Sequence, residues 1–227
     1  MKILMLGPPG VGKGTIGKLL AAKLHVPHFV MGDVIRTHVH AGTAFGKLAG
    51  EKISKGNLIP DERVVSLFFK MTERNRKYAK GVVLDGFPRT PLQIELMHRK
   101  GWNFDAVVHL TASKRTLLRR LCARRICPKC KNVYNLITDP PKTDALCDTD
   151  GARLLLRDDD TPAIVGHRLE VYGRKTKPVV DYYLGTGKLI RVGTERKPKE
   201  ILHLVLTKLR KQLVHKDRGI RPTRKLK

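Results

Sequence analysis

A glycine-rich stretch over residues 7–15, GPPGVGKGT, has the composition and spacing of a phosphate-binding loop. It follows a short apolar run at residues 2–6 and opens a helical pattern, which is the context that such a loop requires. Glycines let backbone N–H groups turn toward a phosphate, and the start of the following helix adds partial positive charge. Lys13 can reach the terminal phosphates, and Thr15 supplies a hydroxyl for Mg²⁺ one position after Gly14. These residues predict a nucleoside triphosphate site.

A second polar motif, DGFPRT at residues 85–90, ends another apolar run and is followed by Gln93. Asp85 is placed like the carboxylate that orders water around Mg²⁺ in enzymes with a phosphate-binding loop. Arg89 is placed to bind a phosphate through two parallel hydrogen bonds. The two motifs together favour phosphoryl transfer, in which the protein supplies positioning and charge stabilisation and forms no covalent intermediate.

Cysteines and one carboxylate form a third pattern, C-x2-C-x16-C-x2-D. Its members are Cys127, Cys130, Cys147 and Asp150. Two knuckles about 15–20 residues apart suit tetrahedral zinc, and a carboxylate oxygen is an acceptable ligand. Four protein ligands leave no open position, so the predicted metal is structural. Disulfides or free thiols stay open as alternatives, as do Asp148 or Asp144 as the fourth ligand, and Cys122 is expected in the core.

Strand and helix patterns alternate around these motifs. Short apolar runs predict five strands, at residues 2–6, 26–30, 81–86, 106–110 and 188–192. Apolar residues at helical spacing predict helices at residues 13–24, 61–78, 113–125, 162–183 and 199–213, with two or three small helices over residues 32–59. Asp61 is predicted to cap its helix. The alternation predicts an α/β fold with a mainly parallel sheet and right-handed crossovers.

The chain is strongly basic, with a formal net charge of +26 over 227 residues. Such a charge favours anionic partners such as nucleotides or nucleic acid. No apolar run approaches the roughly 20 residues that span a bilayer, so no membrane partner is expected. The N-terminus has the features of a first strand and not of a signal peptide. We therefore expect a cytoplasmic protein, and we expect it to act as a monomer.

The three motifs, together with Gly32-Asp33-x-x-Arg36, resemble the adenylate kinase family in type and order over residues 1 to about 205. The resemblance implies a P-loop NTPase fold with a five-stranded sheet flanked by helices. It implies reversible phosphoryl transfer from Mg-ATP to AMP, giving two ADP, for adenine nucleotide homeostasis. It also implies a core at residues 1–30, 61–123 and 161–215, a helical AMP-binding insertion at 31–60, a zinc-bearing lid at 124–160 and a basic tail at 216–227.

Site residues follow from the same resemblance. The ATP side would comprise Gly10, Val11, Gly12, Lys13, Gly14, Thr15, Arg120, Arg124, Val133, Tyr134 and Glu195. The AMP side would comprise Met31, Arg36, Asn57, Leu58, Ile59, Gly86, Phe87, Pro88, Arg89, Gln93, Arg157 and Arg168. Catalysis would rest on Lys13, Asp85, Arg89, Arg124, Arg157 and Arg168. The structural zinc would be held by Cys127, Cys130, Cys147 and Asp150.

Two alternatives to this assignment remain. Met31 stands where the family usually has a threonine or serine hydroxyl near the acceptor base, which favours a kinase of different or relaxed base choice. Gln93 points back to AMP, because the pyrimidine monophosphate kinases of the wider family tend to have asparagine there. The second alternative is a nucleic-acid-binding protein that uses the basic tail. Aromatic residues are only 5%, so no platform for stacking single strands is evident.

Overall fold

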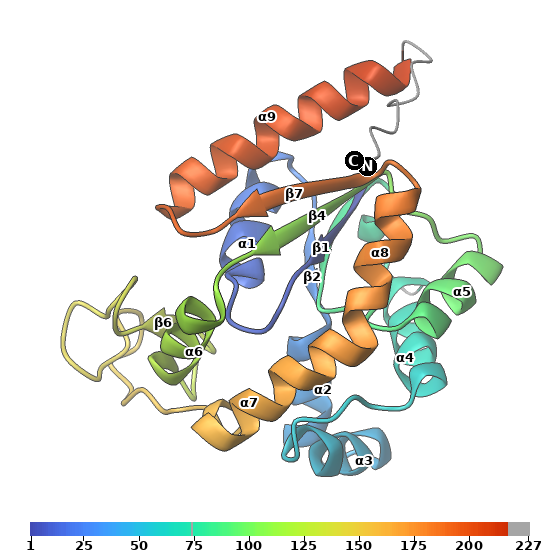
Figure 1. The fold of residues 1–227 in the computed structure, drawn as a ribbon. Helices are drawn as coiled ribbons and strands as arrows, with labels where there is room; N and C mark the ends of the chain where they lie inside the picture. The colour runs from blue at the N-terminus through green and yellow to red at the C-terminus, as the bar shows by residue number, and fades with distance from the viewer. Residues whose placement is uncertain (74, 218–227) are drawn as a thin grey trace.

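The computed structural model describes residues 1–73 and 75–217, with the backbone alone at residues 76, 158 and 213–217 (Figure 1). Its centre is a parallel sheet of five strands in the order β2-β3-β1-β4-β7. The strands are β1 (Lys2–Leu6), β2 (His28–Val30), β3 (Val82–Asp85), β4 (Ala106–Thr111) and β7 (Leu189–Gly193). Because β1 lies between β3 and β4, the loop after β1 and the carboxylate at the end of β3 meet at one edge. The predicted fold class is confirmed.

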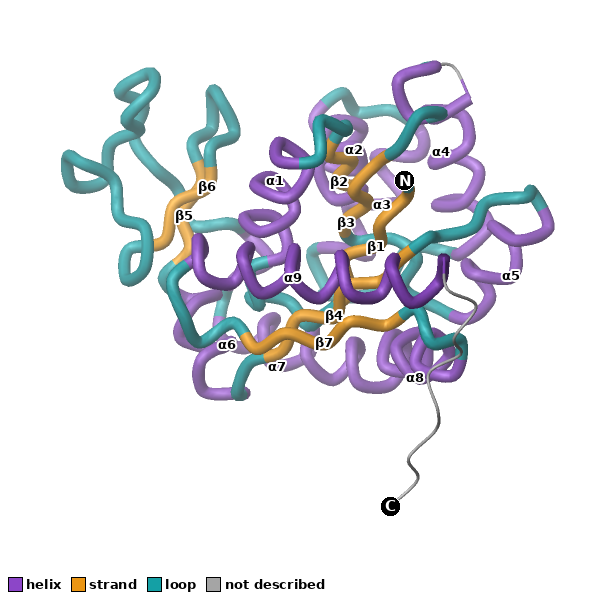
Figure 2. Tube along the Cα trace, turned by 90° about the horizontal axis from the view of Figure 1, so that it is seen from above, coloured by secondary structure: helices purple, strands orange, loops and turns teal. Residues whose placement is uncertain are grey.

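Helices cover both faces of the sheet because alternate side chains of each strand point to opposite sides. Leu4 and Leu6 pack in one hydrophobic cluster with α4 (Asp61–Glu73), α5 (Pro91–Arg99) and α8 (Lys177–Gly185). Ile3 and Met5 pack in a second cluster with α1 (Lys13–Lys23), α6 (Lys114–Cys122) and α9 (Pro198–Asp217). Figures 1 and 2 show α9 running alongside β7 and β4.

Two insertions extend from this core. Residues 31–60 form α2 (Met31–His40) and α3 (Ala44–Ile53), where two or three small helices were predicted over residues 32–59. Residues 124–160, here called the lid segment, contain the antiparallel strands β5 (Arg124–Ile126) and β6 (Val133–Asn135) and end in the 3-10 helix η2 (Asp158–Asp160). The lid segment stands off to one side of the sheet (Figures 1 and 2).

A long helical rod follows the lid segment, and it differs from the continuous helix predicted over residues 162–183. It consists of α7 (Pro162–Val171), a π-helical turn η3 (Tyr172–Thr176) and α8. The wider turn brings the Tyr172 hydroxyl to 3.3 Å from Nε2 of His109 in β4. A π turn arises from packing of this kind, and apolar periodicity does not predict it.

Several predicted bounds require correction. The strand predicted over 26–30 begins only at His28, and the helix predicted over 61–78 ends at Glu73, before the short 3-10 helix η1 (Arg76–Tyr78). Asp61 is the first helical residue and not the cap, because the Arg63 and Val64 N–H groups both donate to the Pro60 carbonyl. The last helix runs on to residue 217, so most of the predicted tail, residues 218–227, lies outside the described residues.

Cys122 also departs from the prediction. It is exposed at the end of α6, because Leu117 and Leu121 are the residues of that helix that turn inward. Among the helices of residues 1–73 and 75–217, none has the length and apolar character needed to cross a bilayer.

Candidate active site

The phosphate-binding loop connects β1 to α1, as its sequence predicts. Gly10 and Gly12 adopt positive φ angles of 80° and 94°, which residues with a Cβ rarely do. A Cβ on Gly10 would also come within 2.7 Å of Leu121 Cγ. Lys13 Nζ donates hydrogen bonds to the carbonyls of Gly7 and Pro8, at 2.8 and 2.9 Å. The lysine thus spans the loop where a phosphate would sit.

Charged groups from distant parts of the chain converge on Lys13. Burial lowers the pKa of Lys13 from 10.5 to about 8, Asp85 raises it, and Arg89, Arg168 and Arg124 lower it further. At pH 7 the side chain remains mostly protonated. The four neighbours come from β3, the turn after it, α7 and β5, so the folded chain assembles the predicted site around one lysine.

Asp85 provides the position suited to a magnesium ion. It ends β3 with only 5% of its surface exposed. Its Oδ2 lies 3.7 Å from the place where a Cβ on Gly14 would stand, so the absence of a side chain there leaves room beside the carboxylate. Thr15 is exposed at the start of α1. A carboxylate and a hydroxyl beside the phosphate loop are oxygen ligands of the kind that Mg²⁺ prefers.

The three predicted arginines of the lid region are held together by two aspartates. Arg124 donates two 2.6 Å hydrogen bonds to Asp160, from Nε and Nη2. Arg168 donates to Asp160 Oδ1 at 2.8 Å and pairs with Asp159 Oδ2 at 3.0 Å. Arg157 forks onto Asp159 at 3.0 and 3.1 Å. Asp160 is fully buried, so these pairs are shielded from water.

Neighbouring charges shift the pKa values of Asp159 and Arg157 in this cluster. Burial alone would raise the pKa of Asp159, but Arg157 and Arg168 outweigh it and the pKa is lowered. Burial, followed by repulsion from Arg124 and Arg36, lowers the pKa of Arg157 to about 10. Three arginines face two carboxylates in this cluster, so it carries an excess of positive charge that can accept anionic phosphates.

Sequence inspection missed Asp159 and Asp160. The available signal was a run of three acids, residues 158–160, in a chain with only 20 acidic residues. The run directly follows Arg157. Its partners Arg124 and Arg168 stand 36 and 8 residues away from Asp160 along the chain, so only the fold brings the pairs together.

On the predicted AMP side, Arg36 and Arg89 both lie near the arginine cluster. Arg89 Nε donates to the Gly86 carbonyl at 2.7 Å, and burial lowers its pKa, with Arg168 as the next cause. Arg36 pairs with Asp33 one turn earlier in α2. The turn that Arg89 closes contains Phe87, which is 1% exposed, and a cis bond to Pro88.

Gln93, predicted to read the adenine edge, is 2% exposed and already has two partners within the chain. Its Oε1 accepts from the Arg89 N–H at 2.6 Å, and its Nε2 donates to Asp61 Oδ1 at 2.8 Å. Met31 is 1% exposed in the hydrophobic cluster that α2 shares with α4 and β3. Both side chains are therefore held by contacts within the chain.

The segment 57–59, predicted to line the same pocket, reaches the helical rod. Asn57 Oδ1 lies 2.9 Å from His167 Nε2 on α7. Ile59 is buried in the hydrophobic cluster, and Leu58 is half-buried between them. This contact links the segment that follows α3 to the helix that carries Arg168.

On the predicted ATP side, Arg120 joins α6 to the turn before α9. It donates to Thr194 Oγ1 at 3.0 Å and to the Thr194 carbonyl at 2.6 Å. Glu195 Oε1 accepts from the Ser113 N–H at 3.2 Å and from Thr116 Oγ1 at 3.1 Å. Ser113 and Glu195 line a hollow of about 560 Å³.

Val133 and Tyr134, predicted together on that side, point in different directions. Val133 is 54% exposed, whereas Tyr134 is buried in the lid segment. The Tyr134 hydroxyl lies 3.4 Å from Cys147 Sγ and accepts from the Asp148 N–H at 2.9 Å. Of the two, only Val133 is free to meet a ligand.

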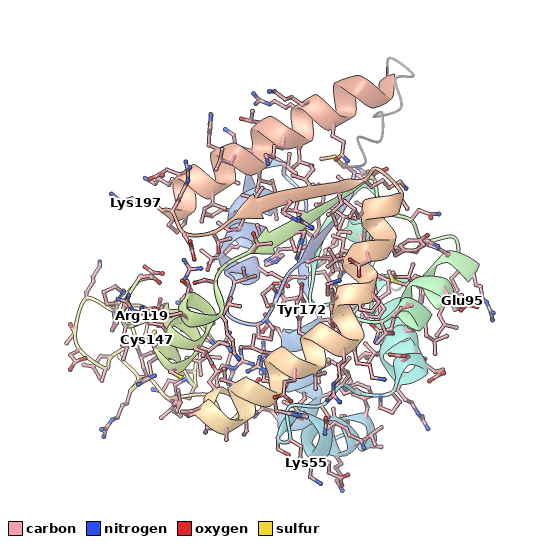
Figure 3. All side chains as sticks on the ribbon, viewed as in Figure 1. Lys55, Glu95, Arg119, Cys147, Tyr172 and Lys197 are labelled. Carbon is pink, nitrogen blue, oxygen red and sulfur yellow. The ribbon has the colours of Figure 1, made fainter. Side chains whose placement is uncertain are left out.

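The four predicted metal ligands come together in the lid segment. The ligand atoms of Cys127, Cys130, Cys147 and Asp150 all lie within 4.8 Å of one another. Cys130 Sγ is 3.4 Å from Cys147 Sγ, well beyond the roughly 2.0 Å of a disulfide. The Ala152 N–H, 3.0 Å from Asp150 Oδ1, holds the pKa of that carboxyl well below its usual range. Three thiols and one carboxylate at this spacing fit tetrahedral zinc. Figure 3 shows Cys147 at the side of the molecule, apart from the sheet.

Comparison with known proteins agrees with this geometry. Residues 5–188 match the profile of a family described as adenylate kinase. A relative named adenylate kinase from Kosmotoga olearia is 44% identical over 198 residues, which cover 85% of this chain and 91% of the relative. Relatives of the same name from Pseudothermotoga lettingae and Methanocella arvoryzae are 40% and 39% identical over 215 residues, which cover 93% of this chain and 99% of each relative.

Proposed function

The chain belongs to the adenylate kinase family, and from this premise we propose that the groups gathered around Lys13 carry out the reversible phosphoryl transfer between Mg-ATP and AMP that gives two ADP. One observation supports these roles: four charged side chains lie close enough to Lys13 to shift its pKa. They are Asp85, Arg89, Arg124 and Arg168. Phosphoryl transfer needs many fixed positive charges, because two nucleotides place several phosphates within a few ångströms.

On the ATP side, the loop N–H groups and Lys13 bind the phosphates. Lys13 exchanges its contacts to the Gly7 and Pro8 carbonyls for contacts to phosphate oxygens, so the loop is already shaped for its ligand. Asp85 and Thr15 hold the Mg²⁺ that accompanies ATP, and that ion neutralises phosphate charge when bound.

On the AMP side, Arg36 and Arg89 grip the monophosphate. One oxygen of that phosphate forms the new bond to the γ-phosphorus of ATP, while the bond from that phosphorus to the oxygen of the β-phosphate breaks. Arg124, Arg157 and Arg168 stabilise the charge that develops on the transferred group. An arginine in such a position contributes on the order of 10³-fold or more in rate.

Asp159 and Asp160 position those arginines. Each guanidinium is held by a carboxylate, which offsets the repulsion among the three clustered cations. Bound phosphates then take over part of the hydrogen bonding, so the arginines need little reorganisation at the moment of transfer.

The two insertions close over the substrates. In this proposal the core comprises residues 1–30, 61–123 and 161–215, residues 31–60 move with AMP, and residues 124–160 close as a lid over ATP. Closure excludes water that would otherwise accept the phosphoryl group. A structural zinc bound by Cys127, Cys130, Cys147 and Asp150 keeps the lid segment folded during this motion. A cytoplasmic location and a monomeric state stay predictions.

An acceptor panel tests the function. We expect AMP to be phosphorylated faster than GMP, CMP or UMP with Mg-ATP as donor, and the variant Met31→Thr to widen this preference. A strong zinc chelator should slow transfer to every acceptor in equal proportion, because the lid segment does not contact the acceptor base in this proposal. Faster transfer to another monophosphate than to AMP would contradict the assigned acceptor.

A further inference from the structure

The charge of the chain is unevenly distributed. Residues 106–138 contain eight Lys/Arg and no acidic residue. This stretch includes α6, whose cations Lys114, Arg115 and Arg119 are exposed. Acidic side chains are instead frequent on α4 and the end of the lid segment, and Glu95 on α5 lies on the opposite side of the molecule from Arg119 in Figure 3.

A second group of exposed cations lies beside α6. It comprises Arg196, Lys197 and Lys199, at the start of α9. The two groups are neighbours because the hydrogen bonds from Arg120 to Thr194, and from Ser113 and Thr116 to Glu195, tie α6 to the turn before α9. Lys197 and Arg119 lie along the same side of the molecule in Figure 3. The six cations Lys114, Arg115, Arg119, Arg196, Lys197 and Lys199 are called the basic face below.

The basic face has few internal counter-charges. Among the side chains that the structure describes, which end at residue 212, no ion pair joins a cation of the basic face, of α6 or of α9 to a carboxylate. Further exposed cations, Lys208, Arg210 and Lys211, continue along α9, which at 20 residues is about 30 Å long. Such a concentration of like charge opposes folding through self-repulsion, and an extended anion would relieve it.

The other side chains on these helices indicate which polyanion fits. The large hydrophobic residues that are exposed lie elsewhere, mainly in the lid segment and on α8, so the basic face has nothing to insert into a lipid surface. The described parts of α6 and α9 contain no Phe, Tyr or Trp, so unpaired bases would find no stacking partner. A duplex keeps its bases stacked inside and offers only phosphates to such a surface.

We propose that the basic face binds the phosphate backbone of double-stranded nucleic acid without reading its sequence. The contact is purely electrostatic, and none of the six cations is among the residues assigned to phosphoryl transfer, although Arg196 lines the hollow beside Glu195. The contact does not require the tail beyond residue 217.

Fluorescence anisotropy with a labelled 20-base-pair duplex tests the proposal on the full chain. RNA and DNA duplexes of the same length form separate arms. We expect dissociation constants in the micromolar range at about 0.15 M salt, and a logarithmic salt slope of about −0.9 per phosphate contacted. The variant with Arg115, Arg119, Lys197 and Lys199 all changed to Gln should bind at least tenfold more weakly, and its slope should become shallower by about three.

Matched controls separate the basic face from net charge. One control changes Lys47, Lys52, Lys70 and Lys80 to Gln, which removes the same charge from exposed positions elsewhere. Another changes Arg221, Arg224, Lys225 and Lys227 to Gln. Both should bind within about twofold to threefold of the unchanged chain, and all variants should retain transfer to AMP, which reports folding.

Several results would overturn the proposal. One is an equal loss of duplex affinity in the basic-face variant and in either control. The others are tighter binding of a single strand than of the duplex, and stronger binding to vesicles of anionic lipid than to the duplex. Displacement of the duplex by saturating Mg-ATP at matched ionic strength would place the contact in the nucleotide site instead. Absence of binding by the unchanged chain at about 0.15 M salt would also refute it.

Discussion

The sheet core and the lid segment are stabilised in different ways. On each face of the sheet a hydrophobic cluster buries side chains such as Phe68, Leu84 and Leu20 completely. The lid segment buries only a small cluster, Cys127, Tyr134, Cys147 and Leu154. Its larger apolar residues are left at the surface, among them Val133 and Leu155 at 54% and 50% exposure.

This difference shows why two of the buried lid residues are cysteines. A segment of this size cannot bury enough apolar surface to offset the entropy of ordering its chain. A metal bound by four side chains supplies the stabilising free energy of the lid segment at one site. In the sheet core, the stabilising free energy comes from many apolar contacts. The four predictions below test this contrast.

Loss of a metal ligand should have the largest effect, and it should be local. Cys147→Ser is expected to abolish stoichiometric zinc binding and to unfold the lid segment, because a structural zinc contributes on the order of 10 kcal/mol in small domains. Zinc content and amide hydrogen exchange measure both effects. Cys122→Ser, at an exposed cysteine outside the cluster, should change neither, and Asp150→Cys should retain the metal. A lid segment that stays protected without zinc would refute the contrast.

Truncation in the sheet core should have the next largest effect, and it should be global. Phe68 is fully buried and its ring packs against Phe29, Phe69, Phe87 and Trp102. Phe68→Ala is therefore expected to lower the free energy of unfolding by about 3–5 kcal/mol in chemical denaturation.

Two comparisons control the Phe68 experiment. Met71→Ala on the same helix, at a side chain 39% exposed, should stay within about 0.5 kcal/mol of the unchanged protein. The zinc affinity of Phe68→Ala should not change while the protein is folded. A parallel loss of zinc affinity would mean that the two regions are coupled.

Acid should weaken the sheet core through His109. Burial, followed by repulsion from Arg191 and Lys13, lowers the pKa of His109 from 6.5 to about 4. The unfolded chain therefore takes up this proton first, so the stability due to neutral His109 is complete above pH 6.5 and is lost as pH falls toward 4. Between pH 7 and pH 5 we expect a loss of about 1–2 kcal/mol. The free energy of unfolding, measured by chemical denaturation at each pH, should not show this loss in His109→Asn. An equal loss in that variant would contradict the assignment.

The smallest effect should come from a group that only supports a ligand. The Tyr134 hydroxyl contacts Cys147 Sγ and the Asp148 N–H, so Tyr134→Phe is expected to weaken zinc binding by about tenfold while the lid segment stays folded. Competition with a chromogenic chelator measures the change. Tyr182→Phe, at a residue 44% exposed on α8, should leave the affinity unchanged.

Features encoded by neighbouring residues were predictable from the sequence. The phosphate loop, the DGFPR motif and the cysteine knuckles each depend on short spacings, and the structure brings their members together. Features that depend on distant pairs were not predictable. Arg120 meets Thr194 across 74 residues, and Gln93 meets Asp61 across 32. The π turn at residues 172–176 is a packing outcome of the same kind, since it places Tyr172 against His109.

The way in which the lid segment is attached has a consequence for its evolution. The end of β5 and the chain near the C-terminal end of the lid segment lie side by side, because the Ile126 and Leu155 backbones exchange two hydrogen bonds of 2.8 and 2.9 Å. The lid segment is therefore a closed loop whose two ends lie next to each other where they join the rest of the molecule. Exchange of the loop for a shorter or longer one changes the entropy of closure only slightly. The metal-binding module can thus be lost, replaced or acquired as a cassette while the sheet beneath it keeps its order.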